Sequence, residues 1–418
     1  MPSSKPVPVS TRPRGFLLAG SLGAALVAAC GGGGGGGSSQ TDSAAAPIAA
    51  DGLPVAAAEP VTAPAPVRSA LAGVSRLVVA GDSLADVGTF GFKFTVQDAA
   101  NALGFPVFPE LVAATWGLPA LCSHYRDDGS GGVVPRGDPS CTSFAVGGGR
   151  ILRGDGPRGI PAQLRDAAAA LAGFGAGDLV LVDGGGNDAS DLAAAYLAGV
   201  TSRTGLLAFL AFLAREVKVG DLLDTAPGDD SLARSANLYM EKAADELAEA
   251  VAEHLLARGA TRVAVLNVPD ITLTPRFSAA FDKLVQEHGA GEAEDIRGAV
   301  RQAVGAFNAR LRERLGNDAR VALVDLRAAV DEQIARAGDH GLSDALHAAC
   351  PVTGQSSSGL PQWSLQTCTS ALLDAGTPGT APGWWTTWAF SDGFHPTPAG
   401  HRLLAGTVNA ALAAANWP

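Results

Sequence analysis

Charged side chains are scarce in this sequence of 418 residues: they make up 17% of it, and basic residues are the scarcer kind. There are 30 Lys and Arg residues against 41 Asp and Glu residues, so the formal net charge is −11. Because a negative protein repels phosphate backbones, we expect no nucleic-acid partner. Hydrophobic residues, at 47%, supply enough apolar material for a sizeable core, which excludes a wholly disordered chain.

Motifs that would indicate several other chemistries are missing. The sequence contains no C-x-x-C and no H-E-x-x-H pattern, so it does not support a metal site, and nothing in it implies a cofactor. It also lacks the G-x-S-x-G turn of the standard α/β-hydrolases, which argues against their layout.

The N-terminal segment has the pattern of an export signal. Residues 1–14 carry three positive charges and no negative one, and 16–29 are apolar, too short a run to span a bilayer comfortably but suited to a signal peptide. Residues 27–30 resemble a bacterial lipobox, which predicts acylation of Cys30. Gly31 then favours an outer-membrane lipoprotein facing the cell surface or the periplasm. The alternative is ordinary cleavage nearby, which would release a soluble secreted protein.

The sequence divides into three parts. Residues 1–29 are the expected signal peptide. Residues 30–72 are rich in Gly, Ala and Pro without periodicity, and cannot bury enough surface to fold, so they predict a flexible tether. Residues 73–418 form one expected domain, which we predict to be a monomer.

Short apolar runs alternate with helical stretches along this domain. Four of the runs are typical of parallel strands buried on both faces: 75–80, 178–183, 261–267 and 320–325. A fifth, weaker candidate is 142–146. The expected helices are 162–174, 206–217, 233–258, 296–315 and 398–413. This alternation predicts an α/β fold, a three-layer sandwich around a mostly parallel sheet, with the chemistry at the carboxyl ends of the strands.

Two long segments interrupt the alternation, 104–140 and 342–391, and each contains two of the four remaining cysteines. Four cysteines in an exported chain allow three connectivities. We prefer the nearest-neighbour pairing, because each bond would then clip one of the loop-rich segments: Cys122 with Cys141, and Cys350 with Cys368.

Four polar blocks follow the ends of elements. Gly81-Asp82-Ser83-Leu84 comes directly after the first strand, where we expect Ser83 at or near a helix N-terminus. The second block, 143–149, ends in three glycines, and the third, 184–188, follows the second strand. The fourth, 391–398, contains an Asp-x-x-His-Pro-Thr run.

In this order the four blocks resemble the GDSL, or SGNH, hydrolase family, and the resemblance spans 76–401. It is closest to the bacterial esterase, phospholipase and haemolysin branch, which shares the Asp-x-x-His-Pro-Thr run and a nearby second histidine, here His401. Pro269 also fits the family's pattern. The resemblance implies a flavodoxin-like sheet.

The resemblance also implies a catalytic triad. Ser83 would be the nucleophile, and His395 would be the base that takes its proton. Asp392 would fix the tautomer of His395 and stabilise the imidazolium.

An oxyanion hole is implied in the same way. It would combine the N–H of Ser83, the side-chain amide of Asn187 and one glycine N–H, for which we prefer Gly148 over the alternative, Gly147. Where the family often has Asn at the start of the second block, this chain has Ser143.

Other candidates are judged on their local sequence. Asp344 and His347 repeat the spacing of Asp392 and His395, but no Pro-Thr follows them. His254 and His288 lie on charged helical stretches, and His124 lies in a disulfide segment, so we expect all three outside the site. Asp82 and Asp86 flank the serine as expected turn residues. The cluster Trp384, Trp385 and Trp388 is open to two interpretations, core filler or the wall of an acyl groove.

The sequence therefore predicts a surface-tethered serine ester hydrolase acting on small-molecule or lipid esters, with an esterase, lipase or phospholipase type left open. A carbohydrate O-acetyl esterase would use the same residues, and a non-catalytic surface lipoprotein is a third alternative. Since His395 must be neutral to act, we expect activity to rise near the ordinary histidine pKa of about 6.5.

Overall fold

The computed structural model describes residues 71–101, 104–225, 230–376, 380–415 and 417. The expected signal peptide, Cys30 and all but the last two residues of the expected tether lie outside these ranges. Among the helices within them, none is long and apolar enough to cross a membrane.

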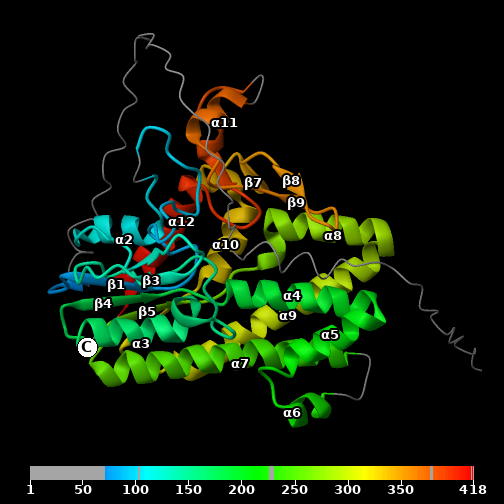
Figure 1. Ribbon diagram of the computed structural model, residues 1–418, viewed down its shortest axis with the longest axis horizontal. Coiled ribbons are helices and arrows are strands. Elements are labelled where there is room, and N and C mark those ends of the chain that lie inside the picture. Colours follow the sequence, from blue (N-terminus) through cyan, green and yellow to red (C-terminus); the bar gives the residue numbers. More distant parts are fainter. Residues whose placement is uncertain (1–70, 102–103, 226–229, 377–379, 416, 418) are drawn as a thin grey trace, which may run out of the picture.

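A parallel sheet of four strands lies at the centre of the structure (Figure 1). In spatial order the strands are β1 (Arg76–Ala80), β4 (Asp178–Val182), β5 (Val263–Leu266) and β6 (Val321–Val324). Each strand falls within one of the four strong apolar runs, and all pairings are parallel. The α/β class predicted from the sequence is confirmed.

The two faces of the sheet are buried in separate cores, because side chains alternate along each strand. Val78 and Val180 belong to the larger core, whereas Leu77 and Leu179 belong to the other. The helices of the larger core are α3 (Ile160–Ala170), α4 (Gly186–Thr201), α5 (Arg203–Leu213), α7 (Ser231–His254), α8 (Pro275–His288) and α9 (Ala290–Leu315). Those of the smaller core are α2 (Phe108–Trp116), α10 (Leu326–Ala335) and α12 (Pro398–Ala414).

The weaker fifth run, 142–146, is not a strand, which corrects the prediction. Ser143 forms single bridges with Val79 on one side and Ser123 on the other. The backbone runs beside β1, with Phe144 N–H donating to Val79 O at 2.6 Å, but the glycine turn that follows cuts the pairing short. The segment still borders the sheet next to β1.

Several helices were not predicted, among them α2, α4, α8, α10 and the short α6 (Val219–Asp224). Helix α4 begins inside the Gly-Gly-Gly-Asn-Asp block, whose composition favours a loop, and α2 lies in a segment rich in Gly and Pro. In both cases burial against the sheet overrides a weak local preference.

Both long segments are closed by disulfides in the expected pairing, with Cα–Cα distances of 4.7 Å for Cys122–Cys141 and 5.6 Å for Cys350–Cys368. The first segment contains the hairpin of β2 (Tyr125–Asp127) and β3 (Val133–Pro135). We call residues 342–391 the cap. It contains β7 (Asp344–Ala348), β8 (Gly354–Gln355), β9 (Pro361–Gln362), α11 (Ser370–Gly376) and β10 (Trp388–Phe390).

Candidate active site

Ser83 lies just beyond the carboxyl end of β1, in a turn. The expectation of a helix N-terminus at this point is wrong, because α2 begins only after a long loop. The turn is instead held by Asp82, whose Oδ1 accepts the Leu84 N–H at 3.0 Å, as expected for a turn residue. Gly81 is required here, since a Cβ would lie 2.9 Å from the Cβ of Asp183.

Ser83, His395 and Asp392 form a continuous hydrogen-bonded line, although 312 positions separate the serine from the histidine. His395 Nε2 lies 2.9 Å from Ser83 Oγ. Its Nδ1 lies 2.8 Å from Asp392 Oδ2 and 3.0 Å from Oδ1. The backbone N–H groups of Phe394 and His395 also donate to Asp392 Oδ1, at 2.8 and 2.7 Å. The three side chains that the sequence selected therefore meet.

The charges within this line support one another. Burial works to raise the pKa of Asp392, but the charge and hydrogen bonds of His395 outweigh burial and lower it. Burial works to lower the pKa of His395, but the charge and hydrogen bond of Asp392 and the charge of Asp82 raise it above its ordinary value. The carboxylate of Asp392 can therefore stabilise the protonated imidazole of His395.

The turn that carries His395 contacts residues from the N-terminal part of the domain. Ser391 Oγ donates to Pro396 O at 2.8 Å and accepts the Val96 N–H at 3.1 Å. The ring of Phe94 lies 5.1 Å from the ring of His395, centroid to centroid. The imidazole therefore has a packed neighbour on one face as well as hydrogen bonds along its edge.

Asn187 extends from the first turn of α4 toward the serine turn. Its Nδ2 donates to Gly149 O at 3.0 Å and, over a longer distance of 3.3 Å, to Asp82 Oδ2. Both amide protons are therefore engaged in this structure, and an oxyanion would have to take one of them over.

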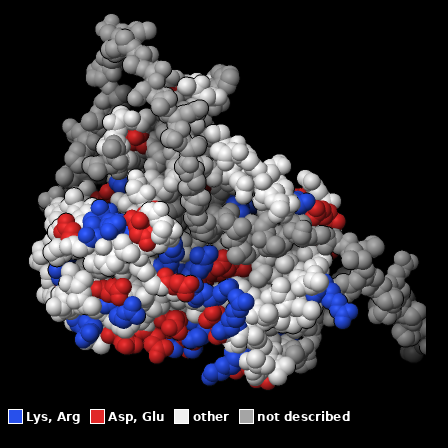
Figure 2. Space-filling model, in the orientation of Figure 1, with Lys and Arg blue, Asp and Glu red and all other residues white. Residues whose placement is uncertain are grey.

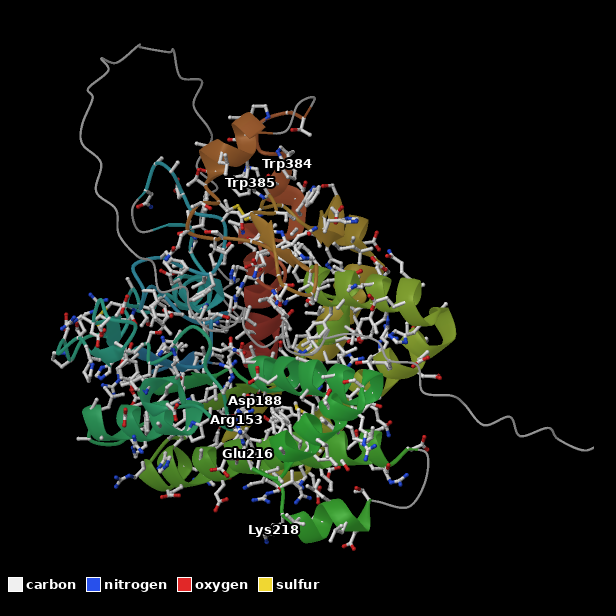
Figure 3. The ribbon with its side chains drawn as sticks, turned by 45° about the vertical axis from the view of Figure 1, so that its right-hand side comes forward. Arg153, Asp188, Glu216, Lys218, Trp384 and Trp385 are labelled. Carbon is white, nitrogen blue, oxygen red and sulfur yellow. A yellow bond between two sulfur atoms is a disulfide. The ribbon has the colours of Figure 1, made fainter. Side chains whose placement is uncertain are left out.

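The glycine turn distinguishes between the two backbone donors considered from the sequence. The N–H of Gly147 donates to Asp86 Oδ2 at 2.8 Å, so it is occupied. The N–H of Gly148 donates to no residue that the structure describes. Gly148 has φ +77°, a conformation that favours glycine. Asp188, labelled in Figure 3, fixes the same turn by accepting the N–H groups of residues 151 and 152 at 2.9 and 2.8 Å.

A second carboxyl group, Asp183 at the end of β4, lies beside Asp82 and was not predicted. Burial, and then the charge of Asp82, raise the pKa of Asp183 well above its usual range. Burial also raises the pKa of Asp82. Asp82 Oδ2 remains the acceptor of the longer contact from Asn187 Nδ2. No local pattern in the sequence marks Asp183. Its neighbour Asp82 follows a different strand, β1, and the sequence does not show that the two residues lie side by side.

These residues open onto a cleft of about 490 Å³. Ser83, His395, Asn187 and Gly148 are among its lining residues. Five aromatic residues line it, namely Phe90, Phe92, Phe94, Trp363 and Phe394, together with polar side chains such as Thr353, Gln362 and Gln366 and the charged residues Asp127, Arg158 and Arg276. The alternation of the first three phenylalanines, directly after the serine block, is the signal in the sequence from which this wall was predictable. The described residues include no group of three or more His, Cys, Asp and Glu side chains that could hold a metal ion.

The competing pair, Asp344 and His347, copies the local geometry of Asp392 and His395. Asp344 Oδ1 accepts the His347 N–H at 2.8 Å, and its Oδ2 lies 2.8 Å from His347 Nδ1. However, the side chain of His347 is 73% exposed, and neither residue lines the cleft. This pair therefore has the spacing of a catalytic aspartate–histidine dyad, but no serine, threonine or cysteine side chain of the described residues forms a hydrogen bond with it.

The other histidines are also outside the cleft lining. His401 is buried, and its Nδ1 accepts the N–H of Phe108, at the start of α2, at 3.2 Å. Burial lowers its pKa to about 3, so its ring is neutral and joins α12 to α2. His124 stacks on Phe144, with ring centroids 4.2 Å apart. His254 lies near Glu253 on the same helix, α7, and His288, at the end of α8, lies near Glu292 of α9.

The tryptophan cluster belongs to the core of the cap. Trp385 is buried, and Trp384 and Trp388 pack around the same apolar cluster as Phe92 and Phe94. Figure 3 shows Trp384 and Trp385 together beside α11, and none of the three lines the cleft. Of the two interpretations, the structure favours core filler, while Trp363 is the tryptophan that walls the cleft.

Comparison with known proteins agrees with this arrangement. The chain matches the family model described as GDSL-like lipase/acylhydrolase over residues 77–408, more than half of its length. No curated protein matches the chain. The matched range begins in β1 and ends in α12, so it encloses Ser83, Asn187, Asp392 and His395. On the extent of this match, the chain belongs to the GDSL-like lipase/acylhydrolase family.

Proposed function

We propose that this chain is a serine hydrolase that cleaves acyl esters through a covalent acyl-enzyme on Ser83. Its family makes it an ester hydrolase in general. The observation that carries the specific proposal is the 2.9 Å contact between Ser83 Oγ and His395 Nε2, both of which line the cleft. A hydroxyl and an imidazole at this distance are placed for proton transfer.

The reaction proceeds in two half-reactions. Ser83 Oγ attacks the ester carbonyl while His395 Nε2 takes its proton, and Asp392 stabilises the resulting imidazolium. The tetrahedral intermediate collapses, and the alcohol leaves with the proton that His395 returns. Water then attacks the acyl-enzyme by the same route, which releases the acid and restores the Ser83 hydroxyl.

The negative oxygen of the intermediate is held by three donors. The N–H groups of Ser83 and Gly148 make no hydrogen bond to any described residue, which supports their assignment. Asn187 contributes its amide by exchanging the longer contact, to Asp82, for the oxyanion. The shorter hydrogen bond, to Gly149 O, then keeps the amide oriented.

Replacing Asn187 by alanine should lower kcat by about 10²–10³-fold with little change in KM, the effect of losing one oxyanion donor. Steady-state kinetics on a soluble nitrophenyl ester measure both constants. A thermal melt checks that α4 is still folded. A kcat within threefold of the wild type would remove Asn187 from the oxyanion hole.

The activity should fall as pH decreases through a value above 6.5. The raised pKa of His395 means that its ring is protonated, and unable to act as a base, over a wider acidic range than an ordinary histidine. We therefore expect kcat/KM to rise with pH and to reach half its maximum above pH 6.5, which is higher than the sequence alone predicts. A flat profile between about pH 5 and 8 would contradict this role of His395.

A fluorophosphonate probe and an ester panel test the function as a whole. An activated serine reacts with the probe, whereas a non-catalytic lipoprotein would stay unlabelled. Nitrophenyl esters of rising chain length, compared with acetylated glycans, separate an esterase or lipase from a carbohydrate O-acetyl esterase. The aromatic wall of the cleft supports apolar acyl chains. Preference for acetylated glycans would favour the alternative.

We also propose the finer assignments that the sequence suggested. The sheet is flavodoxin-like within a three-layer sandwich, which the spatial order 142–146, β1, β4, β5, β6 supports. The division into a signal peptide (1–29), a tether (30–72) and a hydrolase domain (73–418), the bacterial phospholipase-like branch, and an outer-membrane location through acylated Cys30 rest on sequence patterns. Release of a Cys30→Ala variant from membranes, with the wild type retained, tests the anchor.

A further inference from the structure

An ion pair between Arg150 and Asp191 lies behind the glycine turn. Arg150 Nε donates to Asp191 Oδ2 at 2.7 Å and its Nη2 donates to Oδ1 at 3.1 Å, so the pair is bidentate. The two side chains are only 17% and 8% exposed, and neither residue lines the cleft. Figure 2, by contrast, shows charged side chains of both signs interspersed at the surface. Because two charges lose their hydration when they are buried, such a pair adds little to the free energy of unfolding and requires another explanation.

Arg150 also holds the backbone of the glycine turn. The third nitrogen of its guanidinium, Nη1, donates to Gly148 O at 2.8 Å. The turn contains three consecutive glycines, 147–149, whose backbones have more conformational freedom than those of other residues and need partners to hold them in one geometry. Gly147 and Gly149 are held by other side chains. The guanidinium therefore fixes the carbonyl of Gly148, the residue whose N–H we assign to the oxyanion hole.

Asp191 joins the same guanidinium to α4. Asn187 and Asp191 are four residues apart in this helix, so they lie on the same face, one turn apart. From that face Asn187 Nδ2 donates to Gly149 O, and Asp191 accepts from Arg150. Arg150 is therefore a bridge between the two parts of the structure that would supply donors to the oxyanion, the glycine turn and the first turn of α4.

The charge of Arg150 acts on buried carboxyls near the nucleophile. Burial raises the pKa of Asp82, the neighbour of Ser83, and the charge of Arg150 is among the influences that lower it. Burial also raises the pKa of Asp188 to about 7, again against the charge of Arg150. The guanidinium is thus close to the carboxyls that hold the serine turn and the glycine turn.

We propose that Arg150 is a positioning residue of the oxyanion hole, which sets the N–H of Gly148 and the amide of Asn187 in one geometry. It does so by holding the glycine turn and α4 at the same time. The proposal deepens the proposed function and rests on it, because Arg150 acts only through donors that the oxyanion would use. Since these donors act in the transition state, loss of the ion pair should lower kcat and leave KM nearly unchanged.

The test compares two matched double variants of the full chain. The first carries Arg150→Met and Asp191→Leu, because removing the arginine alone would leave a buried carboxylate without its partner and destabilise the fold. The control carries Arg76→Met and Asp178→Leu. Arg76 Nε and Nη2 donate to the two oxygens of Asp178 at 2.7 and 2.9 Å, which is the same bidentate geometry. This control pair joins the first residues of β1 and β4, at the opposite end of the strands from Ser83.

On a soluble nitrophenyl ester the first variant should lose on the order of 10²-fold in kcat with little change in KM, since a small misplacement of catalytic donors has an effect of this size. The inhibition constant of a trifluoromethyl ketone, whose adduct with a serine carries an oxyanion, should rise by a similar factor. Burial, Asp392 and Asp82 are what shift the pKa of His395, so the pH of half-maximal kcat/KM should not change. The control should keep its kcat within about threefold of the wild type.

A second variant, Arg150→Lys, decides the matter if a thermal melt shows that the first does not fold. Its ammonium keeps the charge beside Asp191 but lacks the planar fork that contacts Asp191 and Gly148 together, so kcat should still fall about tenfold.

Three results would overturn the proposal: wild-type kcat in a folded Arg150 variant, an equal loss in the control, or a shifted pH profile with an unchanged inhibition constant. A wild type that hydrolyses no ester overturns the proposed function, and the proposal with it, so the two failures are distinguishable.

Discussion

Ser83→Ala is expected to lower kcat for a soluble ester on the order of 10⁵–10⁶-fold and to abolish labelling by a fluorophosphonate probe. The reason is that, among the described residues, Ser83 supplies the hydroxyl that forms a hydrogen bond with His395 Nε2. A small residual rate over the uncatalysed reaction should remain, because the oxyanion donors and the cleft persist. Single-turnover and steady-state kinetics, together with probe labelling, measure the effect.

Ser364→Ala provides the control for this experiment, because Ser364 also lines the cleft but forms no hydrogen bond with His395. It should keep near wild-type activity and full labelling. Both variants remove one oxygen from a turn or loop, so both should melt close to the wild-type temperature. Labelling of Ser83→Ala at the wild-type rate would mean that another serine is the nucleophile.

Asp392→Asn is expected to lower kcat about 10⁴-fold. The amide has the size of the carboxylate but can donate to His395 Nδ1, which favours the tautomer whose Nε2 carries a proton and cannot accept one from Ser83. The loss of the negative charge also removes the main cause of the raised His395 pKa that opposes burial. Steady-state kinetics over a range of pH measure both consequences.

The chain contains an unusually close control for this substitution. Asp344 makes the same backbone and imidazole contacts as Asp392, in a turn of the same spacing. Because His347 is exposed and lies outside the cleft lining, Asp344→Asn should change kcat by less than a factor of about two. A large loss with Asp344→Asn, or a small loss with Asp392→Asn, would exchange the roles of the two pairs.

The elements predicted correctly are those with strong local patterns. The four strands of the central sheet are continuous apolar runs, since a parallel strand is buried on both faces. Ser83, Asp392, His395 and Asn187 were selected because their blocks, in this order, resemble those of the GDSL, or SGNH, hydrolase family. The disulfides followed from the proximity of each cysteine pair within one loop-rich segment.

Other features were decided by contacts between segments distant in the sequence. Whether Gly147 or Gly148 has a vacant N–H depends on Asp86, and the raised pKa of Asp183, which follows β4, depends on burial and on the charge of Asp82, which follows β1. At Ser83 a turn in which Asp82 accepts the Leu84 N–H takes the place of the expected helix start. Local composition determined where chemistry-bearing residues occur, whereas the tertiary structure decided which of their donors and charges are available, because hydrogen bonds and burial are set by neighbours that the sequence does not place.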